Sequence, residues 1–124
     1  MKVSKIEYPT VLSKIADIDN NNIDVFIELE DGTRITVVVS TPDNLRSYMD
    51  KENLNFISAT QPDIIVKSLT EDNIKQAIEN YAEGDAFWLK LLFVASVDRE
   101  FIDMDRINQC LNKIKKENHE LFDA

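Results

Sequence analysis

The sequence predicts an α+β domain in which a small antiparallel β-sheet is packed on one face by about four helices. Two patterns predict this class. Apolar and polar residues alternate on both sides of the Asp31-Gly32 pair, which is typical of a β-hairpin over residues 23–29 and 33–40. From Thr70 onward, apolar residues recur at spacings of three and four, which indicates helices. A hairpin followed by helices favours α+β over an alternating α/β arrangement.

The hairpin turn decides which side chains share a face of the sheet. A two-residue loop would set polar residues opposite apolar ones, whereas a three-residue loop over residues 30–32 matches apolar with apolar. The longer loop also places Gly32 at the left-handed position that glycine tolerates best. We therefore expect the three-residue loop. The pairs expected from this register are Ile27–Ile35, Val25–Val37 and Glu28–Arg34.

A helix and a third strand are expected after the hairpin. The helix begins at the Thr41-Pro42 pair, because Thr is a good N-cap and Pro fits the first helical turn, and it ends near Glu52. The side chains that we expect it to bury are Leu45, Tyr48 and Met49. The β-branched run that begins at Ile64 predicts a strand over residues 63–68. Phe56 and Ile57 are candidates for a further short strand.

Three more helices complete the predicted domain. Thr70 caps the first of them, whose apolar face consists of Ile74, Ala77, Ile78, Tyr81 and Ala82. Gly84 suits its C-terminal end, and Asp85 is expected to cap the next helix, which is apolar around most of its circumference and is expected to be the central core helix. Residues 97–105 form a charged connection. The last helix carries Met104, Ile107, Leu111, Ile114 and Leu121 at helical spacing.

Two questions of packing stay open at this point. The N-terminal segment, residues 5–18, fits either an edge strand or a short helix. Phe87 and Trp88 are adjacent on the core helix, so they point about 100° apart and cannot face one core direction. We expect two flanking elements to bury both rings; the alternative is one exposed ring that anchors a partner, since Trp is enriched at binding hot spots.

Length and composition indicate one soluble domain, residues 1–124. A hydrophobic fraction of 44% is globular, and a single cysteine excludes an internal disulfide and fits a reducing compartment. Neither a signal peptide nor a run long enough to span a membrane is visible, so we expect a cytoplasmic protein. The net charge of −9 repels nucleic acid and anionic membranes and favours cationic partners, although acidity also serves solubility alone.

A metal site is not expected. The stretch from Asp17 to Glu28 places Asp, Asp, Asn and Glu where an EF-hand loop has calcium ligands. Its position 6 is Asn22 instead of Gly, and its last four residues belong to the predicted strand, whereas an EF-hand loop leads into a helix. One Cys and one His cannot form a zinc site of the usual kinds. We therefore expect neither metal nor cofactor.

No catalytic signature stands out either. Cys110 and His119 lie about 13 Å apart along one predicted helix, too far for a nucleophile and its base. Cys110 is instead expected as a small core residue and His119 as a solvated one. The tightest acidic cluster consists of Asp98, Glu100, Asp103 and Asp105. General acid–base chemistry there is one hypothesis and a partner-binding patch is another. Helix capping by Asp103 or Asp105 within a solvated loop is favoured.

Two stretches, residues 23–45 and 62–88, resemble small bacterial proteins of the immunity-protein type, from contact-dependent inhibition and other polymorphic toxin systems. The shared features are an acidic hairpin that runs into a Thr-Pro-capped helix and a strand followed by a Thr-capped helix. None of these motifs is catalytic. The resemblance implies a non-enzymatic, cytoplasmic inhibitor that binds one toxin domain.

The sequence thus predicts an acidic protein that binds and neutralises a basic toxin domain. Exposed carboxylates would meet Lys and Arg on that partner. The expected partner-binding residues are Glu28, Glu30, Glu79, Glu83, Asp98, Glu100 and Asp103. The alternative is a small cytoplasmic adaptor or regulatory domain that acts through an apolar groove or self-association. The oligomeric state is left open.

Overall fold

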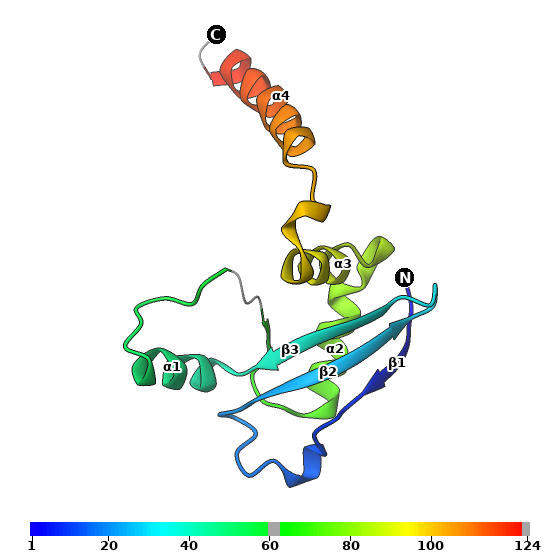
Figure 1. Ribbon diagram of the computed structural model, residues 1–124, viewed down its shortest axis with the longest axis vertical. Helices are drawn as coiled ribbons and strands as arrows, with labels where there is room; N and C mark the ends of the chain where they lie inside the picture. The colour runs from blue at the N-terminus through cyan, green and yellow to red at the C-terminus, as the bar shows by residue number, and fades with distance from the viewer. Residues whose placement is uncertain (60–62, 123–124) are drawn as a thin grey trace.

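The computed structural model of the chain describes residues 1–59 and 63–122, and its sheet has four strands in the order β1-β2-β3-β4 (Figure 1). β1–β2 and β2–β3 pair antiparallel, whereas β4 runs parallel to β3. The strands are β1 (Val3–Glu7), β2 (Asn22–Leu29), β3 (Arg34–Ser40) and β4 (Ile64–Ile65). The α+β class is confirmed, but the sheet is mixed and not purely antiparallel.

The parallel pairing follows from the connection between β3 and β4. Helix α1 (Pro42–Lys51) lies between these two strands in the chain, and a crossover of this kind lets the second strand return in the direction of the first. The strand predicted over residues 63–68 is shorter than expected, because only Ile64–Ile65 pairs with β3. The N-terminal segment supplies the edge strand β1, followed by a single 3-10 turn, η1 (Leu12–Lys14).

The hairpin between β2 and β3 has the predicted register. Ile27 pairs with Ile35, Val25 with Val37 and Glu28 with Arg34. The amide of Leu29 donates to the carbonyl of Thr33 at 2.9 Å, which closes a three-residue loop over residues 30–32. Gly32 has φ +86°, the left-handed conformation that this loop requires. The alternation that predicted the hairpin is also its burial pattern in β2.

The core lies between one face of the sheet and two helices, α2 (Glu71–Tyr81) and α3 (Glu83–Val97). Ile74 and Ile78 of α2 and Leu89 of α3 are fully buried together with the inward side chains of the strands. Thr70 caps α2 as predicted, since its hydroxyl accepts from the amide of Asn73 at 3.1 Å. The core strand residues are Ile23, Val25, Ile27, Leu29, Ile35, Val39 and Ile64.

Helix α1 differs from the prediction in its packing. Its start is confirmed, because the hydroxyl of Thr41 accepts from the amide of Asn44, and its C-cap is Glu52. However, α1 has no buried residue. Tyr48 is exposed, and Leu45 and Met49 are half-buried, so the expectation that these three enter the core is wrong. Residues 56 and 57, expected as a short strand, form no strand, and Phe56 is exposed.

Helix α3 is a boundary helix and not a central one. The chain kinks at residues 84–86, with φ +65° at Gly84 and +53° at Ala86, before the regular part of the helix begins. Phe87 is 58% and Trp88 56% exposed, so the expectation that both rings are buried is wrong. No second layer covers the outer face of α3 in the described part of the chain, and the apolar circumference therefore remains partly open.

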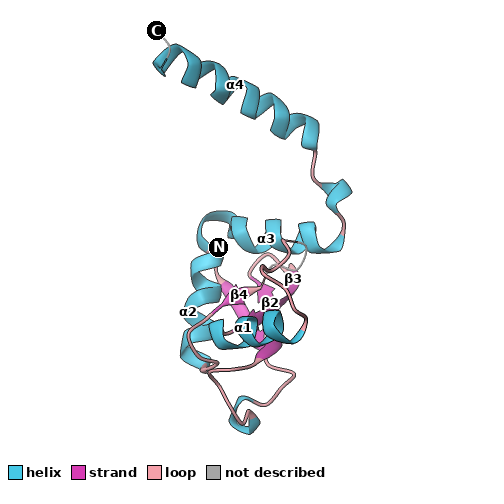
Figure 2. Cartoon of the chain, turned by 90° about the vertical axis from the view of Figure 1, so that its left-hand side faces the viewer, coloured by secondary structure: helices cyan, strands magenta, loops and turns pink. Residues whose placement is uncertain are grey.

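The last helix, α4 (Met104–Phe122), projects away from the rest of the molecule (Figures 1 and 2). A 3-10 turn, η2 (Arg99–Phe101), connects it to α3. Every side chain described in α4 is exposed, including Cys110, which was expected in the core. The expectation that about four helices cover the sheet is therefore not met by α4, and the helical residues of the buried core come from α2, α3 and the junction between them.

Candidate protein-interaction surfaces

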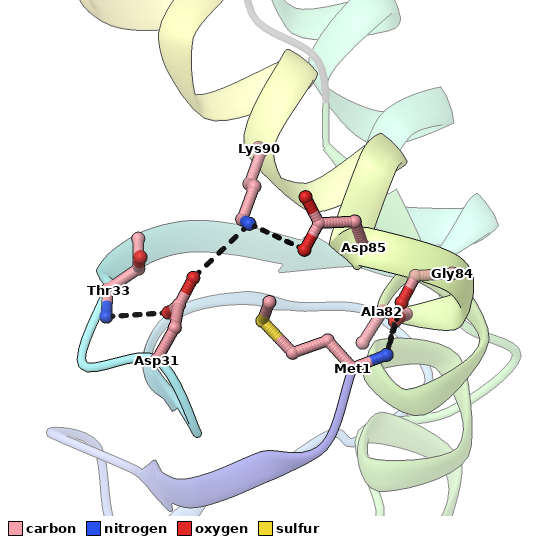
Figure 3. A network of polar contacts seen from close by, with 7 residues as sticks. All are labelled: Met1, Asp31, Thr33, Ala82, Gly84, Asp85 and Lys90. Carbon is pink, nitrogen blue, oxygen red and sulfur yellow. Dashed lines mark hydrogen bonds and ion pairs between the residues drawn. The ribbon is translucent and has the colours of Figure 1, made fainter.

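A polar clamp fastens the hairpin turn to α3 (Figure 3). Lys90 Nζ lies 3.3 Å from Asp31 Oδ2 and 3.2 Å from Asp85 Oδ1. The hydroxyl and the amide of Thr33 donate to the Asp31 carboxylate, and together with Lys90 they lower the pKa of Asp31 to about 2. Asp85 and Asp31 in turn raise the pKa of Lys90. Asp85 lies in the kink at the start of α3. Its carboxylate, which was expected to cap this helix, binds Lys90 instead.

The first two residues extend this connection to the α2–α3 junction. The amino group of Met1 donates to the carbonyl oxygens of Ala82, at 3.1 Å, and of Gly84. The amide of Glu30 donates to the carbonyl of Lys2 at 3.0 Å. The hairpin turn and the junction between α2 and α3, remote in the sequence, therefore lie close together at one end of the sheet (Figures 1 and 3).

Three of the predicted partner-binding carboxylates belong to this end. We define the acidic end as Glu30 in the hairpin turn, Glu79 in the last turn of α2 and Glu83 at the start of α3. All three are exposed, and none forms an ion pair with a residue that the structure describes. Their charges are uncompensated and are carried on segments that the polar clamp holds in place. Such charges attract a cationic partner.

Glu28 occupies a different surface. It is half-buried on the outer face of β2, and its carboxylate lies 3.7 Å from Arg34 Nε. On the neighbouring strand, Lys5 and Glu7 pair at 2.7 Å, and their hydrogen bond raises the pKa of Lys5 and lowers that of Glu7. The charges of Lys5, Glu7, Glu28 and Arg34 on the open face of the sheet thus already have local partners.

The remaining predicted acids lie at the connection between α3 and α4. Asp98 Oδ1 accepts from the amide of Glu100 at 2.9 Å, and Asp103 Oδ1 accepts from the amide of Arg106 at 3.1 Å. Asp98 therefore caps η2 and Asp103 caps α4, and capping by Asp103 is one of the two alternatives that the favoured interpretation named. All the carboxylates of this segment, Asp105 included, are exposed, and Asp98 and Glu100 line an open pocket beside the end of α3. Among the described residues, the carboxylates of Glu100 and Asp105 make no capping contact.

A groove with both apolar and polar lining separates α1 from α3. The apolar residues that line this α1–α3 groove are Val37, Val38, Leu45, Tyr48, Ile57, Ile64, Leu92 and Phe93, and the polar ones are Asn22, Thr36, Asn44, Asp63 and Ser96. Its volume is about 570 Å³, within the range of protein clefts that hold ligand groups. At one edge the hydroxyl of Ser40 donates to Asp63 at 2.5 Å. Sequence reasoning missed the groove, because it assumed that the apolar side chains of α1 enter the core.

The exposed ring pair of α3 adds a second apolar feature. The centroids of Phe87 and Trp88 are 5.1 Å apart with an interplanar angle of 81°, an edge-to-face contact. Each ring therefore shields part of the other from water. The alternative considered for the sequence, an exposed aromatic anchor, is closer to this arrangement than the expected burial.

Among the described residues, no group of three or more His, Cys, Asp or Glu side chains has the geometry to hold a metal ion. Residues 25–28 lie in β2, as the argument against an EF-hand loop required. Cys110 and His119 are both exposed on α4. None of the helices that the structure describes is long and apolar enough to cross a membrane.

The comparisons with known proteins leave the family of the chain open. No protein-family model, no curated protein and no solved structure matches this chain.

Proposed function

We propose that this chain is a non-enzymatic binding protein and that it acts as an immunity protein, which neutralises a bacterial toxin by binding a basic domain of it. The observation that carries the proposal is the acidic end, where Glu30, Glu79 and Glu83 are exposed and unpaired within the described residues. A toxin that acts on nucleic acid needs Lys and Arg to contact phosphates. Carboxylates on an inhibitor can occupy the same cationic site.

The physical chemistry of the acidic end suits this role. A net charge of −9 steers a cationic partner toward the molecule and raises the association rate. The polar clamp keeps the hairpin turn and the α2–α3 junction together, so little ordering is needed when the partner binds. Glu28, Asp98, Glu100 and Asp103 remain predicted contacts of lower priority, because three of them already bind Arg34 or backbone amides.

The test is a charge-reversal experiment with a matched control. The full chain captures partners from a lysate of the source organism at low and at high salt, and a captured basic protein is then produced and assayed for toxicity with and without this chain. The test variant is Glu30→Lys/Glu79→Lys/Glu83→Lys. The control is Asp24→Lys/Asp50→Lys/Glu120→Lys, which changes exposed acids elsewhere. Both variants raise the charge by two units at each of three positions, from −9 to −3.

The expected result is a single toxic partner that binds tightly at low salt, is neutralised by the chain and is no longer neutralised by the acidic-end variant. The control variant retains neutralisation. Equal binding by both variants would overturn the proposal for the acidic end. A captured partner without toxicity, or binding that is insensitive to salt, would overturn the immunity function.

A second candidate function is that of an adaptor that binds an apolar segment of another protein. The α1–α3 groove favours it, because Tyr48 and Phe93 leave apolar surface open beside a cleft. This binding would survive high salt, since apolar contacts are not screened. It would be lost in Tyr48→Glu and kept in the acidic-end variant, the reverse of the result expected for the immunity function.

A further inference from the structure

Helix α4 stands apart from the other elements (Figure 2), and the side chains of its apolar seam are all exposed. We define the seam as Met104, Ile107, Leu111, Ile114, Asn118 and Leu121. Its members alternate at spacings of three and four residues, and the one polar member is Asn118. A lone helix of this length is marginal in water, because most helical stability in proteins comes from packing of an apolar face. We therefore expect another protein surface to cover the seam.

The seam is narrow, and its width indicates which kind of partner fits. Between Met104 and Leu121 the positions that flank it are Asn108, Cys110, Lys115 and Glu117, of which three are polar or charged; the apolar Phe122 follows at the end of the helix. A helix that packs against a globular body has a wider stripe, which includes one of these flanking rows. A stripe limited to the two rows of a heptad repeat is the seam of a coiled coil. The partner expected for α4 is thus another helix.

We infer that α4 pairs in parallel with α4 of a second copy of this chain and forms a short two-stranded coiled coil. Parallel pairing places Asn118 opposite Asn118 of the second copy, where the two amides bond one another. A single Asn at this heptad position fixes the register and favours two strands, against the larger bundles that Leu111 and Ile114 at their positions favour. Antiparallel pairing with full overlap would place Asn118 opposite Ile107. A buried amide without a partner is costly, so the parallel orientation is favoured.

The low net charge of α4 favours pairing between two copies of this helix. The helix carries four basic residues, Arg106, Lys113, Lys115 and Lys116, and three acidic ones, Asp105, Glu117 and Glu120, so it is close to neutral in a chain of charge −9. Two copies of α4 do not repel each other strongly. A strongly cationic partner, of the kind that the acidic end attracts, has little electrostatic attraction to this near-neutral helix. The seam and the acidic end are therefore suited to different partners.

The buried area sets the expected affinity. Six seam positions on each of two helices, with their flanking side chains, remove on the order of 1,000 Å² from water, which is the lower limit for a specific interface. We therefore expect a dimer with a dissociation constant on the order of tens of micromolar. The two acidic bodies lie at the same end of a parallel pair, so added salt screens their repulsion and strengthens the dimer.

The first experiment is sedimentation of the full chain over a concentration series from about 5 to about 500 µM, a range that brackets the expected affinity. The seam variant is Leu111→Glu/Ile114→Glu. The matched control is Gln109→Glu/Asn112→Glu, which adds the same two charges to the outer face of the same helix. Because α4 buries none of its described residues, neither variant should disturb the body, and circular dichroism checks this.

The wild type and the control should form dimers, and the seam variant should bind at least about tenfold more weakly. A wild type that stays monomeric throughout the range would overturn the proposal, as would a dimer that the seam variant retains. The salt response separates this proposal from the proposed function: the dimer strengthens with salt, whereas a partner bound at the acidic end is released. Either one can therefore fail while the other stands.

The second experiment tests the orientation in a Cys110→Ser background. With oxidised glutathione present, Met104→Cys alone should give a disulfide-linked dimer if the helices are parallel. In an antiparallel pair the two introduced cysteines would be about 25 Å apart, far beyond the reach of a disulfide. A link that forms only in a mixture of Met104→Cys and Leu121→Cys chains would overturn the parallel pairing.

The α1–α3 groove of the second copy is the competing location for the seam. In that arrangement the dimer would be abolished by Tyr48→Glu as well as by the seam variant, and Met104→Cys would form no link by itself. This outcome would overturn the coiled coil. A dimer that tolerates Tyr48→Glu and is linked through position 104 supports it.

Discussion

Asp31 illustrates how one residue in a turn connects two layers of the molecule. It accepts two hydrogen bonds from Thr33 within the turn, and it also contacts Lys90 on α3. These contacts hold its pKa at about 2, below the ordinary value of 3.8. Because the folded-state pKa is the lower one, the stabilisation by ionised Asp31 is complete above about pH 4 and is lost as the pH falls toward 2.

The first prediction concerns Asp31→Asn. This change removes the charge and keeps an acceptor for Thr33, so the thermal midpoint at neutral pH should fall, and the difference from the wild type should shrink as the pH approaches 2. Circular dichroism melts between pH 7 and pH 2.5 measure this. Asp50→Asn, at an exposed carboxylate without an ion pair among the described residues, is the control. A difference that is constant with pH would mean that Asp31 acts through shape and not through charge.

No sequence pattern links Asp31 to Lys90. The Asp-Gly pair predicts the turn and the conformation of Gly32, which are local properties. The ion pair depends on where α3 crosses the hairpin, and that is decided by the packing of Leu89 and Ala86 against the strands. The acidic end has the same origin: Glu30 and Glu83 were each predicted to be exposed, but only the structure places their segments at one end.

Elements that depend on local chemistry lie where the sequence predicts them. Thr41 and Thr70 both cap helices, and β2 and β3 pair in the register that the alternation of side chains requires. Elements whose packing depends on residues remote in the sequence differ from the prediction in which side chains they bury. An amphipathic pattern on α1 or α4 indicates an apolar face but does not identify the surface that buries it. The predicted burial of Tyr48 and of Cys110 is therefore wrong.

The second prediction concerns the start of α1. Thr41 is fully buried, and its hydroxyl accepts from the amides of Asn21 and Asn44 and donates to the carbonyl of Asn21. It thus connects the helix cap to the beginning of β2. Thr41→Ala should reduce the free energy of unfolding by about 1–2 kcal/mol, because it removes a cap and leaves buried backbone groups unpaired.

Urea denaturation measures this loss. Thr41→Ser keeps the hydroxyl and should recover most of the stability, which separates the hydrogen bonds from the packing of the methyl group. A change below about 0.5 kcal/mol in Thr41→Ala would indicate that water replaces the hydroxyl and that α1 is weakly coupled to the sheet. Because α1 has no buried residue, its coupling to the start of β2 rests on Thr41 and on two exposed hydrogen bonds, Asn20–Ser47 and Asn22–Asn44.

At the scale of the whole molecule, the chain consists of a packed body and a helix that stands apart from it. The body comprises the sheet, α1, α2 and α3, and its buried cluster includes no residue of α4. The net charge of −9 belongs to the body, since α4 is close to neutral. Salt should therefore have opposite effects on the two proposed interactions, weakening contacts of the acidic end and strengthening pairing of the seam.

The third prediction follows from this division. Ending the chain after residue 103 removes α4 and none of the buried core, so the free energy of unfolding at low micromolar concentration should change by less than about 0.5 kcal/mol. Ile78→Ala, in the middle of the core, is the positive control and should cost about 2–5 kcal/mol. Urea denaturation compares the two, and circular dichroism should show the loss of helical signal in the shortened chain.

The change in the free energy of unfolding on removal of α4 also indicates what the seam packs against. A loss of stability as large as that of Ile78→Ala would show that α4 packs against the body in solution. The seam would then belong in the α1–α3 groove of its own chain, where Leu92 and Phe93 lie half-buried, and not against a second copy. An unchanged body would leave the apolar seam without an internal partner. In that case the tendency of apolar surface to leave water favours association through α4.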